Sequence, residues 1–132
     1  MTIAEVAKKF DITTDTIRYY ERIGLIPPIK RDKNGNRIFT EIDCNWVYYI
    51  KVMRGAGISI EKLVEYVKLF QMGIDTIPTR KKILMEQYET LEEQINKLKS
   101  TQDILKKKID GYEERIIAYE KNKLNTKNKL EG

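Results

Sequence analysis

The chain has 132 residues, of which 41% are hydrophobic and 34% charged, with a formal net charge of +5. This length supports one modest core rather than a two-domain enzyme, and the composition is neither that of a disordered polymer nor that of a membrane protein. Because there is no histidine and a single cysteine, Cys44, we expect no catalytic residues, no metal site, no cofactor and no internal disulfide.

Residues 2–10 are predicted to form a short helix. Thr2 and Glu5 fit the capping box, in which each side chain accepts a hydrogen bond from a free amide of the first turn. The charged residues Glu5, Lys8 and Lys9 interrupt the apolar run that a secretory signal needs. No apolar stretch approaches the ~20 residues that span a bilayer. We therefore expect a cytoplasmic protein that does not enter a membrane.

A second helix is predicted to follow after a short turn. Thr13 or Thr14 can cap it, and Gly24 stands just past its expected end near Ile23. Asp11 occupies a turn position where glycine is common, and aspartate tolerates positive φ better than most residues. Two short helices joined in this way make a helix-turn-helix.

Residues 29–39 are predicted to form a β-hairpin wing. Asn34-Gly35 favours a type I′ turn, because both residues accept positive φ. Residues 18–37 contain six basic and two acidic side chains, so the densest positive charge of the chain coincides with the second helix and the wing. Such a charge run is often only a solvated surface.

Two supporting helices are predicted next, which completes a winged helix-turn-helix domain over residues 1–75. Thr40 and Asp43 form another capping-box candidate, and Ser59 can cap the helix that follows. Helical spacing predicts that the first of these helices buries a stripe running from Ile42, with Cys44 outside it. That stripe consists of Ile42, Trp46, Tyr49, Ile50 and Met53.

Residues 79–121 carry a different pattern. Seam residues alternate at spacings of four and three, which predicts one long coiled-coil helix, about 54 Å from Leu84 to Tyr119 at ~1.5 Å per residue. A narrow apolar seam needs a partner helix, most simply from a second copy, and Gln102 is its polar position. Residues 122–132 are expected to be a flexible tail. The expected dimerisation residues are Leu84, Tyr88, Leu91, Ile95, Leu98, Gln102, Leu105, Ile109, Tyr112 and Ile116.

Several segments resemble the MerR family of bacterial transcription regulators. The run Thr16-Ile17-Arg18-Tyr19-Tyr20-Glu21-Arg22-Ile23-Gly24 is similar to the family's N-terminal signature, and Arg37-Ile38-Phe39 is similar to its wing. The resemblance implies a mainly α fold, with the winged helix-turn-helix followed by an antiparallel dimerisation coil. It also implies binding to a pseudo-palindromic operator within a promoter spacer, and bending and untwisting of that DNA for RNA polymerase.

The resemblance also suggests which residues contact DNA. Arg18 is the first candidate for a base or phosphate contact, and pairing with Asp15 or Glu21 is the alternative. Either tyrosine of the signature can instead pack inward, Thr14 can serve as a cap, and Arg54 can be an ordinary helix-end cation. The expected DNA-binding set is Thr14, Thr16, Arg18, Tyr19, Tyr20, Lys33, Arg37, Phe39 and Arg54.

Two alternatives stay open. Cys44 is a candidate electrophile sensor, but a lone cysteine is more often inert. The chain resembles the aldehyde- and thiol-stress branch of the family, yet Val52 occupies that branch's sensing-cysteine position. The second alternative concerns function: a coiled-coil adaptor whose winged domain binds protein, which would have no use for the converging basic side chains. The inducer is not predicted.

Overall fold

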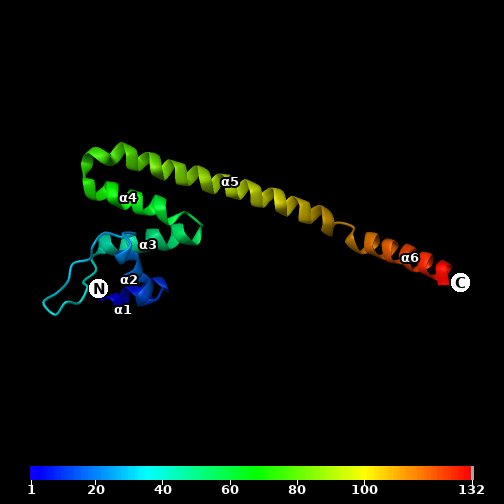
Figure 1. Ribbon diagram of the computed structural model, residues 1–132, viewed down its shortest axis with the longest axis horizontal. Helices are drawn as coiled ribbons and strands as arrows, with labels where there is room; N and C mark the ends of the chain where they lie inside the picture. Colours follow the sequence, from blue (N-terminus) through cyan, green and yellow to red (C-terminus); the bar gives the residue numbers. More distant parts are fainter. Residues whose placement is uncertain (132) are drawn as a thin grey trace. The chain divides into compact units, whose positions relative to one another are not determined.

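The computed structural model describes the backbone of residues 1–131 and the side chains of residues 1–123. The chain divides into two compact units, Met1–Glu89, here called the head, and the residues from Thr90 onward. None of the helices in the described range is long and apolar enough to cross a bilayer. In chain order the helices (Figure 1) are α1 (Ile3–Phe10), α2 (Thr14–Arg22), α3 (Glu41–Gly55), α4 (Ile60–Met72), the short 3-10 helix η1 (Ile74–Thr76), α5 (Ile77–Ile109) and α6 (Tyr112–Glu131).

Helices α1 and α2 form the predicted helix-turn-helix. The Thr2 hydroxyl accepts a hydrogen bond from the Glu5 amide at 3.2 Å, and the Glu5 carboxylate accepts one from the Thr2 amide at 3.3 Å. Asp11 ends α1 with φ 54°, in the left-handed region, as its position in the turn predicted. Thr13 caps α2 by accepting from the Thr16 amide at 3.0 Å. The left-handed backbone of Asp11 therefore sets the first end of this turn, and the side-chain cap of Thr13 sets the second.

The wing lies between α2 and α3 and has one antiparallel bridge, between Arg31 and Arg37. The Asp32 carbonyl accepts a hydrogen bond from the Gly35 amide at 3.1 Å, and Gly35 has φ 81° whereas Asn34 has no positive φ. The type I′ turn centred on Asn34-Gly35 is therefore wrong, and a four-residue turn ending in a left-handed glycine takes its place. The Asp32 carboxylate favours this turn, because it accepts hydrogen bonds from the Asn34 amide at 2.8 Å and from the Asn36 amide at 2.9 Å.

The core of the head draws side chains from all its longer helices. Helix α4 buries Leu63 and Val67. Helix α3 buries Ile50, as the expected stripe predicted, but it also buries Cys44, which was expected outside the stripe, and leaves Ile42 65% exposed. Helix α3 carries apolar residues on two adjacent faces, and periodicity does not tell which one α1 covers. The largest fully buried side chains are Ile17, Leu25, Ile26, Ile50, Leu63, Val6, Val47 and Val67.

Aromatic rings join α3 to α4. The ring centroid of Trp46 lies 5.1 Å from that of Phe70 and 5.7 Å from that of Tyr66. Tyr49 lies on the same side of α3, with its ring 5.8 Å from that of Tyr66. Edge-to-face and tilted pairs at these separations stabilise packing beyond their buried area. This cluster holds α4 in a fixed position beside α3.

The first turns of α5 belong to the head. Ile83 is 6% exposed and Gln87 is 4% exposed, and the Tyr49 hydroxyl donates a hydrogen bond to the Gln87 side-chain oxygen at 2.7 Å. The compact unit therefore ends at Glu89 and not at residue 75, the boundary expected from sequence. Seam spacing alone did not predict this, because Ile83 and Gln87 are not seam residues and lie along one side of the seam.

The expected single helix over residues 79–121 is interrupted. Helix α5 begins at Ile77 and ends at Ile109, and Gly111 has φ 69°, a conformation that stops a helix. Arg115 satisfies the end of α5, because its Nη2 donates to the carbonyl oxygens of Lys107, Lys108 and Asp110 at 2.9, 2.7 and 2.6 Å. The tail expected over residues 122–132 is helical in its backbone to Glu131, while its side chains beyond residue 123 and all of Gly132 lie outside the described residues.

Candidate nucleic-acid interface

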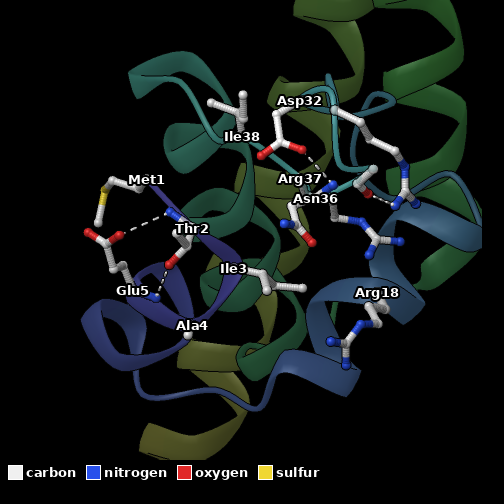
Figure 2. A pocket seen from close by; sticks show the side chains of 12 residues that line it. Met1, Thr2, Ile3, Ala4, Glu5, Arg18, Asp32, Asn36, Arg37 and Ile38 are labelled. Carbon is white, nitrogen blue, oxygen red and sulfur yellow. Dashed lines mark hydrogen bonds between the residues drawn. The ribbon is translucent and has the colours of Figure 1, made fainter.

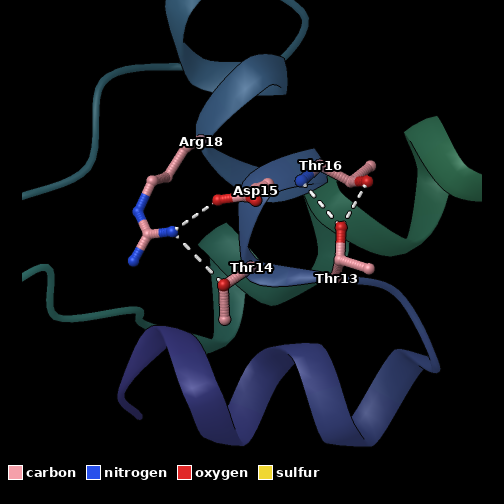
Figure 3. A network of polar contacts seen from close by, with 5 residues as sticks. All are labelled: Thr13, Thr14, Asp15, Thr16 and Arg18. Atoms are coloured by element: carbon pink, nitrogen blue, oxygen red, sulfur yellow. Dashed lines mark hydrogen bonds and ion pairs between the residues drawn. The ribbon is translucent and has the colours of Figure 1, made fainter.

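Polar side chains at the start of α2 form two small sets, Thr13 with Thr16 and Arg18 with Thr14 and Asp15 (Figure 3). The hydroxyl groups of Thr13 and Thr16 lie 2.7 Å apart. The Thr14 hydroxyl accepts a hydrogen bond from Arg18 Nη1 at 3.2 Å, so Thr14 supports Arg18 while Thr13 provides the cap. Thr14 and Thr16 are both half-buried. The structure thus brings Thr14 and Arg18 together, whereas Thr16 bonds Thr13.

Arg18 is exposed and paired. Its Nη1 donates to Asp15 Oδ1 at 2.9 Å, and the two side chains are 47% and 92% exposed (Figure 3). This is one of the alternatives that the sequence left open for Arg18. An exposed ion pair contributes about 0–1 kcal/mol, so an anionic ligand can displace Asp15 at little cost. The pairing therefore leaves Arg18 available for a phosphate or a base edge.

The two adjacent tyrosines of α2 point in different directions. Tyr19 is 38% exposed, and the guanidinium carbon of Arg22 lies 5.5 Å from the centre of its ring. Tyr20 is 8% exposed, and burial raises the pKa of its hydroxyl while the nearby charge of Arg54 opposes that rise. Of the two, Tyr19 is the more exposed to a ligand. The sequence left open that one of the two tyrosines packs inward, and in the structure that one is Tyr20.

The wing presents its charges unevenly. Lys33 is exposed at the turn, and Arg31 Nη1 donates to the Gly35 carbonyl at 2.8 Å. Phe39, expected from the family resemblance to contact DNA, is 2% exposed and packs in the core. The bulky ring at the end of the wing fills the space beside α3, so burial outweighs any surface role.

Arg37 does not extend freely from the wing. Its Nε donates to Glu21 Oε1 at 2.6 Å, and the two side chains are 17% and 15% exposed. Burial alone would raise the pKa of Glu21, but the hydrogen bonds from the Ile29 amide and from Arg37, with the charges of Arg37 and Arg31, lower that pKa overall. Glu21 is therefore ionised at neutral pH. The sequence pointed to Arg37 as a phosphate contact, and the structure places it in an ion pair with α2.

A cavity of about 440 Å³ lies between the start of α1, Arg18 of α2 and the wing (Figure 2). Three guanidinium groups line it, those of Arg18, Arg31 and Arg37, together with the carboxylates of Glu5 and Asp32. The surplus of cations suits an anionic ligand. The sequence pointed to basic wing residues converging beside Arg18, but it did not indicate that the start of α1 lines the same cavity.

Two further candidates lie away from this cavity. Arg54, in the last turn of α3, is exposed and donates from Nη1 to the Ile58 carbonyl at 2.8 Å. Cys44 is 3% exposed, with its sulfur 3.8 Å from that of Met1. A reactive sensing thiol needs solvent access, and the structure shows Cys44 as a core residue. Val52, by contrast, is 41% exposed on α3.

The predicted dimerisation seam faces solvent along its length. Within the head, Leu84 and Tyr88 are 39% and 72% exposed. Beyond the head, Leu98 is 69% exposed and Ile109 is 68% exposed, and Leu91 and Ile116 are half-buried. Exposed apolar side chains that repeat along one face of a helix are typical of an interface.

Comparison with known proteins identifies the family. The model of the MerR HTH family of regulatory proteins matches residues 1–69. The chain belongs to the MerR family. It is 52% identical over 91 residues to the HTH-type transcriptional regulator AdhR of Bacillus subtilis, a match that covers 69% of this chain and 65% of AdhR.

Solved MerR structures share the fold. A MerR-type protein from Listeria monocytogenes superposes with a TM-score of 0.84 at 39% identity, over 100% of this chain and 99% of that one. HiNmlR, a MerR family regulator lacking the sensor domain, superposes with a TM-score of 0.77 at 32% identity, over 86% of this chain and 90% of HiNmlR. The HiNmlR structure was determined bound to promoter DNA. The predicted fold, a mainly α chain with a winged helix-turn-helix followed by a long helix, is thereby confirmed.

Proposed function

We propose that the protein is a sequence-specific DNA-binding transcriptional regulator that acts as a homodimer on promoter DNA. The observation that carries this proposal is the exposed Arg18 of α2, which bonds Thr14 and lines a cavity together with Arg31 and Arg37 of the wing. The family membership and the promoter DNA bound by HiNmlR support it. No catalytic residue and no cofactor is part of the proposal.

Helix α2 is the proposed recognition helix, because its exposed end fits the major groove, which is ~12 Å wide. There Arg18 would bond a guanine edge or a phosphate, and Thr14 and Thr16 would meet base edges or thymine methyl groups once Asp15 releases Arg18. Tyr19 and Lys33 would reach phosphates on either side. Phosphate contacts of this kind supply much of the affinity and make it salt-dependent.

Arg54 is proposed as a further backbone contact from α3, on the evidence of its exposed guanidinium. Tyr20 and Phe39 would act indirectly, since both are buried and support the surfaces that carry Tyr19 and the wing. The proposed contacts thus come from three elements of the head, namely α2, the wing and the end of α3.

A second copy is proposed to cover the seam of α5 and α6. Residues such as Leu98 and Leu105, 69% and 54% exposed, would pack on a partner helix, and antiparallel pairing would present two recognition helices to a pseudo-palindromic operator. The dimer would then bend and untwist the promoter spacer for RNA polymerase. The energy of that deformation depends on the DNA sequence, so it would contribute to recognition. An adaptor that binds protein through the winged head is not favoured, because the relatives are HTH-type regulators.

The test is fluorescence anisotropy on the duplex upstream of the protein's own gene, at physiological salt with excess competitor DNA. We expect saturable binding by one dimer per duplex. Arg18→Ala should weaken that binding by about 10- to 100-fold, while Lys68→Ala, which removes an exposed cation from α4, should leave it nearly unchanged. If competitor abolishes wild-type binding, a genome-fragment selection follows, and failure of that selection would overturn the proposal.

A further inference from the structure

One carboxylate of α2 holds both sides of the wing. Glu21 Oε2 accepts a hydrogen bond from the Ile29 amide at 2.8 Å, before the wing turn. Glu21 Oε1 accepts from Arg37 Nε at 2.6 Å, after the turn. The Glu21 and Arg37 side chains are only 15% and 17% exposed, so water competes poorly for these bonds. Both ends of the wing are therefore attached to the same residue of α2.

The internal bonds of the wing join its two sides and its turn to each other, and none of them fixes the wing relative to α2. Its two sides are joined by the bridge between Arg31 and Arg37, and Ile38 N donates to the Lys30 carbonyl at 2.8 Å. An isolated two-stranded ribbon of this size is marginally stable in water. Its position relative to α2 must then come from contacts with the rest of the head, and the bonds of Glu21 are charge-assisted, which makes them stronger than neutral ones.

Electrostatics alone argues against a carboxylate at this place. Glu21 lies on the proposed recognition helix and bonds Arg37, which lines the cationic cavity. A negative charge near phosphates opposes DNA binding by repulsion. Glu21 would lower the affinity unless the order that it imposes on the wing contributes more.

We infer that Glu21 is a positioning residue for DNA binding, which fixes the wing against the recognition helix so that both reach one duplex together. This inference rests on the proposed function. Arg37 then acts mainly through its bond to Glu21, and the exposed Lys33 at the turn becomes the phosphate contact that Glu21 places. Preorganisation of this kind raises affinity by removing the entropy of ordering a mobile segment on binding.

The experiment compares Glu21→Gln with Glu65→Gln, which removes the same charge from the exposed side of α4. Amide hydrogen exchange of the free protein gives the first readout. We expect the amides of Asp32 and Ile38 to exchange at least about tenfold faster in Glu21→Gln, with α4 unchanged. Equal exchange in the two variants would overturn the positioning role.

Fluorescence anisotropy on the promoter duplex gives the second readout. The direction of the change in Kd distinguishes a positioning role of Glu21 from a purely repulsive one. The positioning role predicts that Glu21→Gln raises Kd by about tenfold, whereas a purely repulsive carboxylate predicts a lower Kd. An unchanged or lower Kd would overturn the inference while leaving the proposed function intact. Failure of the wild type to bind duplex DNA would instead overturn the proposed function, and the exchange readout would still test the attachment of the wing.

Arg37→Lys covers the case in which Glu21→Gln does not fold. It keeps the positive charge but loses the Nε–H that bonds Glu21. The inference predicts a Kd raised by about fivefold in Arg37→Lys, with faster exchange in the wing. Wild-type affinity and wild-type exchange in this variant would show that charge alone matters at position 37, and would overturn the inference.

Discussion

The hydroxyl of Tyr49 lies 2.7 Å from the side-chain oxygen of Gln87, and this hydrogen bond joins α3 to α5 inside the head. Gln87 is 4% exposed, and its Nε2 has no hydrogen-bond partner among the described residues. Burial raises the pKa of Tyr49, the bond to Gln87 opposes that rise, and the neighbouring Tyr66 adds to it. The first turns of α5 are therefore attached to the head through a buried polar contact that depends on one hydroxyl.

Tyr49→Phe removes that hydroxyl and leaves the Gln87 amide without its partner. The loss of the bond, with desolvation of the buried amide, should lower the free energy of unfolding by about 1–3 kcal/mol. Urea unfolding followed by circular dichroism measures it. Tyr48→Phe, at a 57% exposed position of the same helix, is the matched control and should change it by less than about 0.5 kcal/mol. Equal effects of the two substitutions would contradict the role assigned to this bond.

Asp15→Asn removes the carboxylate that holds Arg18 in the free protein. The exposed pair adds little to stability, so the free energy of unfolding should change by less than about 1 kcal/mol. Affinity for generic duplex DNA should rise, because Arg18 is released and one repulsive charge is lost. Anisotropy over a series of salt concentrations measures this, and weaker binding by Asp15→Asn would mean that the pair holds Arg18 in its DNA-binding orientation.

Leu98→Lys places a charge in the proposed dimer seam. Burying that charge against a partner helix is costly, so the variant should be monomeric at concentrations where the wild type is a dimer. Sedimentation velocity measures the change. Gln94→Lys introduces the same side chain at an exposed position outside the seam and should remain dimeric. If Leu98→Lys stays dimeric as well, the assembly surface lies elsewhere.

Acid should weaken the attachment of the wing. The folded pKa of Glu21 is lowered below its ordinary value of 4.5, so its contribution to stability is present above the unfolded pKa and is lost as the pH falls through the folded pKa. The difference in unfolding free energy between the wild type and Glu21→Gln should therefore be full at neutral pH and shrink below about pH 4. Chemical unfolding of the two proteins at neutral pH and below about pH 4 measures this difference. A difference that grows on acidification would contradict a lowered pKa of Glu21 in the folded protein.

The sequence by itself determined the local structure of this protein. The capping pairs Thr2–Glu5 and Thr40–Asp43 and the left-handed Asp11 follow from interactions within three or four residues, so the helix starts and the turn were predictable. The family signature on α2 likewise pointed to Arg18 as an exposed residue. Each of these depends on neighbours along the chain and hardly on the rest of the fold.

Only the tertiary structure decided which side chains of a helix are buried and which distant residues pair. Periodicity showed that Tyr19 and Tyr20 point apart but not which one is buried, and it placed Cys44 on the wrong side of α3, because both depend on what packs against each face. The pairing of Glu21 with Arg37 spans sixteen residues, and that of Tyr49 with Gln87 spans thirty-eight. Such bonds form only when separate elements are brought together by the fold. The bond of Arg37 to Glu21 attaches the wing to α2, whereas the sequence alone suggested that Arg37 would be free.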